Sequence, residues 1–145
     1  MRSLQIVVEP YASNHLKQVV EDGLGLYNVA VTGFAEYYPV AIFLKDEHGE
    51  ILGGVLGQIW GKWLRIAILW LAEPVRRQGY GSQLLLTAEA YARERGCRHV
   101  QLSTFSFQAR PFYEKLGYEV FATLEDCPVG HCEYFLRKQL AELDE

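Results

Sequence analysis

The stretch Val75-Arg76-Arg77-Gln78-Gly79-Tyr80-Gly81-Ser82 decides how this chain is interpreted, because it separates two segments of different periodicity. The apolar run from Ile66 to Ala72 precedes it and predicts a strand, and apolar residues at helical spacing follow it. The start of a helix leaves N–H groups unpaired and carries about half a positive charge. Glycine allows close backbone approach, and arginine adds fixed positive charge. The turn is therefore predicted to bind a phosphate-bearing anion.

The glycine spacing excludes two common phosphate-binding motifs. A P-loop needs Gly-Lys-Ser/Thr at a fixed distance, and none follows here. The dinucleotide fingerprint needs a third glycine where this chain has Leu84. A Gly-x-Gly before a helix is often only a turn, so the interpretation needs support from elsewhere in the chain.

A second motif gives that support, in Ala109-Arg110-Pro111-Phe112-Tyr113-Glu114-Lys115-Leu116-Gly117-Tyr118. Together, Arg76-x-x-Gly79-x-Gly81 and Tyr113-x-x-x-Gly117-Tyr118 resemble the two motifs of the GCN5-related N-acetyltransferases, the GNAT superfamily. The resemblance is firm from about Ile66 to Tyr118. It implies an α/β fold of one GNAT-like domain over residues 1–145, with a central, mostly antiparallel sheet, one splayed parallel pair and flanking helices.

The resemblance also implies acetyl-CoA as the cofactor and coenzyme A as the product. In the family, the glycine turn binds the pyrophosphate and the preceding strand pairs with the pantetheine arm. The cofactor-binding residues expected here are Trp70, Leu71, Arg76, Arg77, Gln78, Gly79, Tyr80, Gly81, Ser82, Ser106 and Tyr113. The chain departs from the family at Ser106, where an asparagine is usual, and the segment 104–107 is expected to line the far wall of the cleft.

Tyr113 matches the usual general acid of the family, and a phenol with a pKa of about 10 keeps its proton at neutral pH. The general base stays open. Some relatives use a glutamate on the strand before the turn, but the stretch 64–68 holds no acid and Glu73 lies past the strand end. His131, Glu133 or a water chain to a distant carboxylate are the alternatives, and histidine titrates in a useful range.

The acceptor pocket is expected opposite the cofactor, with Tyr37, Tyr38, Trp60 and Trp63 as its candidate residues. Aromatic rings there could bind a cation, although plain packing is an equally ordinary role. Glu36 and Asp126 are candidate partners for an ammonium group, with solvated surface charge as the alternative.

The resemblance implies an N-acetyltransferase that transfers the acetyl group directly to a primary amine of a small molecule or peptide. The alternatives are a non-catalytic module that binds or senses acyl-CoA, and an unrelated α/β protein that binds a nucleotide phosphate. The sequence does not select an acceptor. Many relatives are dimers, so a homodimer is one of the states that remain open.

The composition limits the partners further. A net charge of −4 argues against nucleic acid. The longest apolar run, Ile66 to Ala72, is far shorter than the roughly 20 residues of a membrane span, and the N-terminus lacks a signal-peptide core. The cysteines Cys97, Cys127 and Cys132 are expected to be reduced thiols, with no metal site. The expected location is the cytoplasm.

The pattern also predicts the elements. Before the glycine turn these are a strand over 4–8, a helix over 14–22 capped by Ser13, a second helix over 26–32 after two interrupting glycines, and strands over 40–44, 51–60 and 63–71. Bulges or close approaches are expected at Gly53, Gly54 and Gly57. The strand 63–71 is continuously apolar, so burial on both faces is expected.

After the turn, a helix is expected with Glu89, Arg93 and Glu94 on its exposed side, ended by Gly96. The remaining elements are a strand over 99–104, a helix over 107–116, and strands over 118–122 and 133–137.

Overall fold

The structure is a computed structural model that describes residues 2–141. The chain divides into two compact units, one ending at Ala35 and one beginning at Glu36. Each unit is described separately below. No helix in residues 2–141 is long and apolar enough to cross a membrane.

The first unit contains one helix, α1 (Asn14–Thr32). The predicted cap at Ser13 is confirmed, because its Oγ accepts a hydrogen bond from the N–H of Leu16 at 3.4 Å. The predicted interruption at Gly23 and Gly25 is wrong, since the helix continues through both. A glycine costs a helix only about 1 kcal/mol, which the flanking helix formers offset.

The predicted strand over residues 4–8 is also wrong. Within the described residues 2–141, these residues form neither helix nor strand and belong to no sheet. An apolar segment becomes a strand only when a neighbouring strand pairs with it, and the sequence pattern does not show whether such a neighbour is present.

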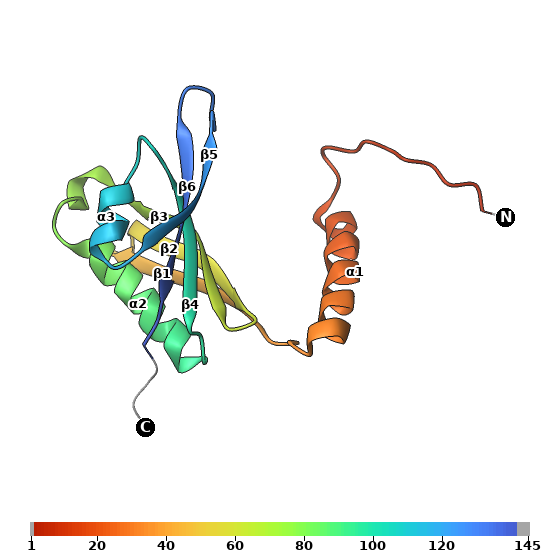
Figure 1. Cartoon of the computed structure of the whole chain (residues 1–145), viewed down its shortest axis with the longest axis horizontal. Coiled ribbons are helices and arrows are strands. Elements are labelled where there is room, and N and C mark those ends of the chain that lie inside the picture. The colour runs from red at the N-terminus through yellow and green to blue at the C-terminus, as the bar shows by residue number, and fades with distance from the viewer. Residues whose placement is uncertain (1, 142–145) are drawn as a thin grey trace. The chain divides into compact units, whose positions relative to one another are not determined.

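The second unit is a six-stranded mixed sheet with strand order β1-β2-β3-β4-β6-β5 (Figure 1). The strands are β1 (Tyr37–Lys45), β2 (Ile51–Trp60), β3 (Trp63–Leu71), β4 (His99–Phe105), β5 (Glu119–Glu125) and β6 (Cys132–Gln139). The helical elements are η1 (Glu73–Val75), α2 (Tyr80–Glu94) and α3 (Arg110–Lys115). All neighbours are antiparallel except β3 and β4, which confirms the predicted architecture.

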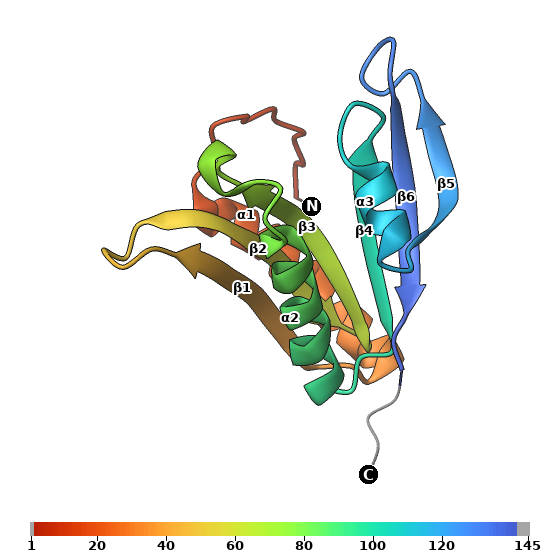
Figure 2. The same cartoon turned by 90° about the vertical axis from the view of Figure 1, so that its left-hand side faces the viewer.

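The parallel pair separates early. Only Trp63, Leu64 and Arg65 of β3 pair with β4, opposite His99 to Gln101. Figure 2 shows the two strands diverging from that point, with α2 beside β1–β3 and α3 beside β4 and β6 on the same side of the sheet. The predicted splayed pair is therefore confirmed.

The first two hairpins are set by short polar turns. Asp46 Oδ1 accepts hydrogen bonds from the N–H groups of His48 and Glu50 at 2.8 and 2.9 Å, which closes the turn between β1 and β2. Gly61 and Lys62 both have positive φ, as a two-residue hairpin turn requires. The bounds of β2 and β3 agree with the sequence prediction.

The core lies between the sheet and α2. Leu85, Ala88 and Ala92 of α2 are fully buried against the sheet, as their spacing predicts. The expectation that β3 is buried on both faces is wrong, because Leu64 and Ile66 are buried while alternate residues are exposed. Burial alternates in β3 because α2 covers only one side of this part of the sheet.

The predicted exposed position of Glu89 is wrong as well. The Glu89 side chain is fully buried, and its carboxylate accepts hydrogen bonds from Tyr118 Oη and Lys138 Nζ, each at 2.8 Å. Arg93 Nη2 lies 4.0 Å from the same carboxylate. A buried carboxylate is retained only where such partners replace water, and its periodic position on the helix does not reveal them.

We expect Lys138→Met to destabilise the protein by about 3 kcal/mol, because it leaves the buried Glu89 charge without its closest cation. Arg137→Met is the matched control on the same strand. It removes an ion pair with Glu119 whose two side chains are 54% and 70% exposed, so its expected cost is at most about 1 kcal/mol. Urea unfolding of both variants measures the difference, and equal losses would show that the Glu89 cluster is not a stability determinant.

Candidate functional site

The N-terminus of α2 is open to a ligand. Its N-cap, Gly79, has a φ of 86° and no side chain to bond the first-turn N–H groups, and the first turn contains no acidic residue. These N–H groups have no intrahelical partner and carry the positive end of the helix dipole. The predicted anion-binding turn therefore has the geometry that such a site requires.

Two side chains of the turn fix its shape. Arg76 Nε donates to the carbonyl of Leu71 at 2.9 Å, and Gln78 Nε2 donates to the carbonyl of Pro74 at 3.0 Å. A guanidinium has five N–H donors, so Arg76 keeps others for an anion. Arg77 is exposed and has a φ of 63°. Both arginines thus place positive charge beside the open helix start.

Within the glycine turn, Gly81 is the residue that lies against α3. A side chain at Gly81 would begin 3.3 Å from the ring of Phe112 and 3.6 Å from Leu71, so a larger residue here would press on the Phe112 ring. Tyr80 and Ser82 are half-buried in the same helical turn. The position of α3 therefore depends on the start of α2.

The second half of β3 has one free edge. Trp70 and Leu71 pair with Gly54 and Gly53 of β2, and β4 pairs with no residue of β3 beyond Arg65. An unpaired strand edge offers N–H and C=O groups to an extended ligand. This edge is unpaired where the pantetheine arm is expected, and the Leu71 carbonyl already accepts the Arg76 side chain.

A β-bulge lies where this free edge begins. Gly57 pairs with Ile66 and Leu56 pairs with Ile68, which leaves Ala67 as the extra residue. A Cβ at Gly57 would overlap the carbonyl of Arg65, so the approach of the two backbones requires glycine. The expectation of a bulge or close approach at this glycine is confirmed. No signal in the sequence marks Ala67 itself.

Tyr113 lies inside the structure, beside the end of β4. Its side chain is buried, with the rings of Phe112 and Tyr118 at centroid distances of 5.1 and 6.0 Å. The N–H of Ala109, at the start of α3, donates to Thr104 Oγ1 at 3.3 Å and so ties the helix to β4. Burial raises the pKa of the Tyr113 phenol above its usual value, which keeps the proton on Oη at neutral pH.

Ser106 connects the end of β4 to β6. Its N–H donates to the carbonyl of Cys132 at 2.8 Å, and its Oγ accepts from the N–H of Cys132 at 3.0 Å. The hydroxyl hydrogen can still be donated to a ligand. Ser106 therefore has a structural role at the position where the family's asparagine is usual.

The two candidate bases lie beside this connection. His131 is exposed, and its ring packs edge-on against Phe107 at 4.9 Å. Glu133 pairs with Phe105 across the β4–β6 ladder and lies 3.8 Å from Cys127 Sγ. Since β3 and β4 are parallel, both residues lie at the end of the sheet that carries the glycine turn.

The structure does not bring the four predicted acceptor aromatics together. Tyr37 Oη donates to Gln58 Oε1 at 2.9 Å, whereas Tyr38, the next residue along β1, faces the other side of the sheet. There Tyr38 donates to Glu36 Oε2 at 3.1 Å and lies under Arg95 at 5.5 Å.

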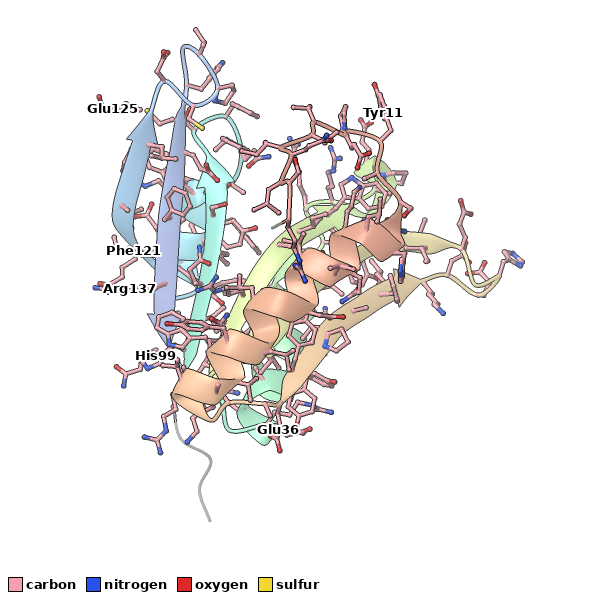
Figure 3. The ribbon with its side chains drawn as sticks, turned by 90° about the vertical axis from the view of Figure 1, so that its right-hand side faces the viewer. Tyr11, Glu36, His99, Phe121, Glu125 and Arg137 are labelled. Carbon is pink, nitrogen blue, oxygen red and sulfur yellow. The ribbon has the colours of Figure 1, made fainter. Side chains whose placement is uncertain are left out.

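The other two aromatics lie at the start of β3. Trp60 and Trp63 flank the hairpin turn, and Trp63 stacks on His99 at 4.5 Å. Figure 3 shows His99 at the opposite end of the β4–β6–β5 part from Glu125. These tryptophans are thus distant from the glycine turn at the other end of β3.

The two candidate acids, Glu36 and Asp126, already have local partners. Glu36 accepts a hydrogen bond from Tyr38, and Asp126 accepts one from the N–H of Gly130 at 2.8 Å.

A hollow of about 500 Å³ lies where β3 leaves β4. Its lining comes from β2, β3, β4 and β6, and consists of Leu56, Gly57, Gln58, Arg65, Ile66, Ala67, Gln101, Ser103 and Phe135. The sequence does not reveal this hollow, because its residues become neighbours only through the strand order. The signal available was Gly57, which marks the close approach of β2 to β3.

Comparison with known proteins agrees with this geometry. The model of the acetyltransferase (GNAT) family matches residues 10–118. Blasticidin-S acetyltransferase of Streptomyces morookaense is 40% identical over 101 residues, which are 69% of this chain and 74% of that protein. Acetyltransferase Atu2258 of Agrobacterium fabrum is 27% identical over 136 residues, 94% of this chain and 99% of that one. A crystal structure of an acetyltransferase from Bacillus cereus ATCC 14579 aligns with a TM-score of 0.80 at 36% identity, over 92% of this chain and 98% of that one.

We expect Gly79→Ala to weaken acetyl-CoA binding several-fold, since a positive φ costs a non-glycine residue about 1–2 kcal/mol and the start of α2 would shift to relieve it. Gly61→Ala is the matched control. It also has a positive φ in open space, at the other end of β3. Calorimetric titration should give an unchanged dissociation constant for Gly61→Ala, and equal effects in the two variants would contradict the assignment.

Proposed function

Because the chain belongs to the acetyltransferase (GNAT) family, we propose that it transfers the acetyl group of acetyl-CoA directly to a primary amine of a small molecule. The protein is an acetyltransferase, and acetyl-CoA is its cofactor. The observation that most supports the use of acetyl-CoA is the uncapped start of α2 beside the free edge of β3. We also propose that residues 1–145 act as one catalytic domain, since the family match crosses the boundary at Ala35.

The residues of the turn have separable roles in this proposal. The first N–H groups of α2 and the side chains of Arg76 and Arg77 hold the pyrophosphate, and the free edge at Trp70 and Leu71 orients the amide arm. When bound, acetyl-CoA supplies the acetyl group as a thioester. The bulge at Ala67 exposes backbone at the start of the gap, close to where such an arm would end.

We assign the proton donor to Tyr113. A phenol is protonated at neutral pH, as an acid that protonates a departing group requires, and burial raises the pKa of Tyr113 further. Its position between the end of β4 and the start of α2 is fixed on several sides, by Thr104 through Ala109 and by the contact of Gly81 with Phe112.

The proton of the incoming ammonium group needs an acceptor. We propose that this acceptor is His131 or Glu133, which lie near the start of β6, where that strand pairs with the end of β4. A water chain to a carboxylate is the remaining alternative. An alkyl amine is almost wholly protonated at neutral pH, so an acceptor of this kind requires this step.

The acceptor is proposed from the relatives. The 40% identical relative bears the name blasticidin-S acetyltransferase, so blasticidin S is the first compound to test. Release of coenzyme A that depends on the added amine would support transfer. Hydrolysis or binding of acetyl-CoA without such dependence would favour a sensing module.

Tyr113→Phe should lower kcat at least about tenfold, because general acid catalysis typically contributes a factor of about 10²–10⁴. The dissociation constant of acetyl-CoA should stay the same, since the ring is retained. Steady-state kinetics and calorimetry measure the two quantities. Tyr91→Phe, a half-buried tyrosine of α2 outside the site, serves as the control, and unchanged turnover in Tyr113→Phe would remove this residue from the mechanism.

His131→Ala should shift or abolish the acidic limb of the pH profile of kcat/KM if the imidazole takes the proton, because a general base that already carries a proton cannot accept another. Glu133→Gln is measured in parallel on the same strand. An unshifted profile with intact turnover excludes the residue that was changed, and two unshifted profiles would leave the water chain as the path.

A further inference from the structure

We propose that the hollow between β3 and β4 binds a carboxylate of the acceptor through Arg65, so that the preferred substrates are amines that also carry a carboxylate. This inference rests on the proposed acetyl transfer, and it adds a recognition group that the family match does not specify.

The hollow lies where β3 and β4 separate, beside the start of the free edge of β3. Arg65 and Gln101 form the last ladder position before the two strands separate, and both line the hollow. The bulge residue Ala67 also lines it. A ligand in the hollow therefore lies beside the start of the gap in which the free edge of β3 runs.

The hollow opens on the face of the sheet that α2 does not cover. Leu64 and Ile66 are buried, whereas Arg65 between them is exposed. On β4, Val100 and Leu102 are buried, and Gln101 and Ser103 alternate with them. The acceptor would thus approach from the side opposite to α2 and α3.

The charge of this hollow is positive. Arg65 is the one charged side chain among the described residues that line it. Within residues 2–141, Arg65 has no ion pair, side-chain hydrogen bond or ring contact. An exposed guanidinium with unused donors in the lining of a concave surface favours an anion.

The uncharged polar residues add hydrogen-bond donors. Gln58 Oε1 accepts from Tyr37 Oη at 2.9 Å, which fixes the amide so that its nitrogen remains available to donate. Gln101 contributes a second amide and Ser103 a hydroxyl. The two amides and the hydroxyl line the same hollow as the Arg65 guanidinium. All of these groups can donate hydrogen bonds, so together they suit a ligand group that only accepts them.

A carboxylate fits these donors best. Its two oxygens accept parallel N–H donors from a guanidinium, and this bidentate arrangement fixes orientation as well as position. With the carboxylate held at Arg65, the other end of the molecule is directed along the gap.

The test compares ω-amino acids of increasing length with their carboxamides: glycine, β-alanine, 4-aminobutanoate and 6-aminohexanoate. Release of coenzyme A is measured for each pair. We expect the acid to exceed its amide at least tenfold in kcat/KM for one or two lengths. The best length reports the distance from Arg65 to the reacting amine. Equal values for every acid and its amide would overturn the proposal.

Variants then locate the effect. Arg65→Gln should bring the ratio of acid to amide close to one, mainly through the KM of the acid. Arg137→Gln is the matched control, since this arginine of β6 is also exposed but does not line the hollow. If both variants kept the preference, Arg65 would not be the recognition group.

A binding measurement separates this proposal from the proposed transfer. Arg65 guanidinium signals are followed by NMR in the protein saturated with coenzyme A, with N-acetyl-β-alanine or its carboxamide added and Arg65→Gln used for assignment. A shift with the acid alone supports the carboxylate site even if no amine is acetylated, in which case only the transfer fails. If neutral amines are acetylated while Arg65 does not respond to the acid, the transfer stands and the carboxylate site is refuted.

Discussion

The separation of β3 from β4 after three paired positions is the constraint on which the rest of the site depends. Parallel strands that continued to pair would satisfy each other's backbone groups and leave no edge for a ligand. Here the bulge at Ala67, made possible by Gly57, turns β3 away from its neighbour. The same strand then leads into the uncapped start of α2. The free edge of β3 and the anion site at the start of α2 are therefore adjacent along the chain.

A separated sheet needs a connection elsewhere, and Glu89 provides one. It belongs to α2, which packs on β1, β2 and β3, yet its carboxylate bonds Tyr118 before β5 and Lys138 on β6. The buried charges therefore join the two halves of the sheet behind the gap. Tyr118 also packs against Tyr113, so this connection supports the proposed proton donor.

Much of this fold could be predicted from the sequence, because strand and helix periodicity and the two motifs are local signals. The splayed pair, β2, β3 and the cap at Ser13 agree with the prediction. The failures involve distant partners: the segment 4–8 belongs to no sheet within the described residues 2–141, and the burial of Glu89 depends on its bond with Lys138. Likewise, the predicted aromatics at Tyr37 and Tyr38 face opposite sides of β1, whereas Arg65 gains its place only from the neighbouring strand β4.

Hydrogen exchange of backbone amides with and without acetyl-CoA tests the central claim most directly. The account predicts slower exchange in two places at once, along the free edge of β3 from Ile66 to Leu71 and in the first turn of α2. Amides of β1 should change little, because they lie two strands from the gap. Protection of the helix start without the strand edge, or of neither, would contradict the account in which the separation of β3 from β4 creates the cofactor site.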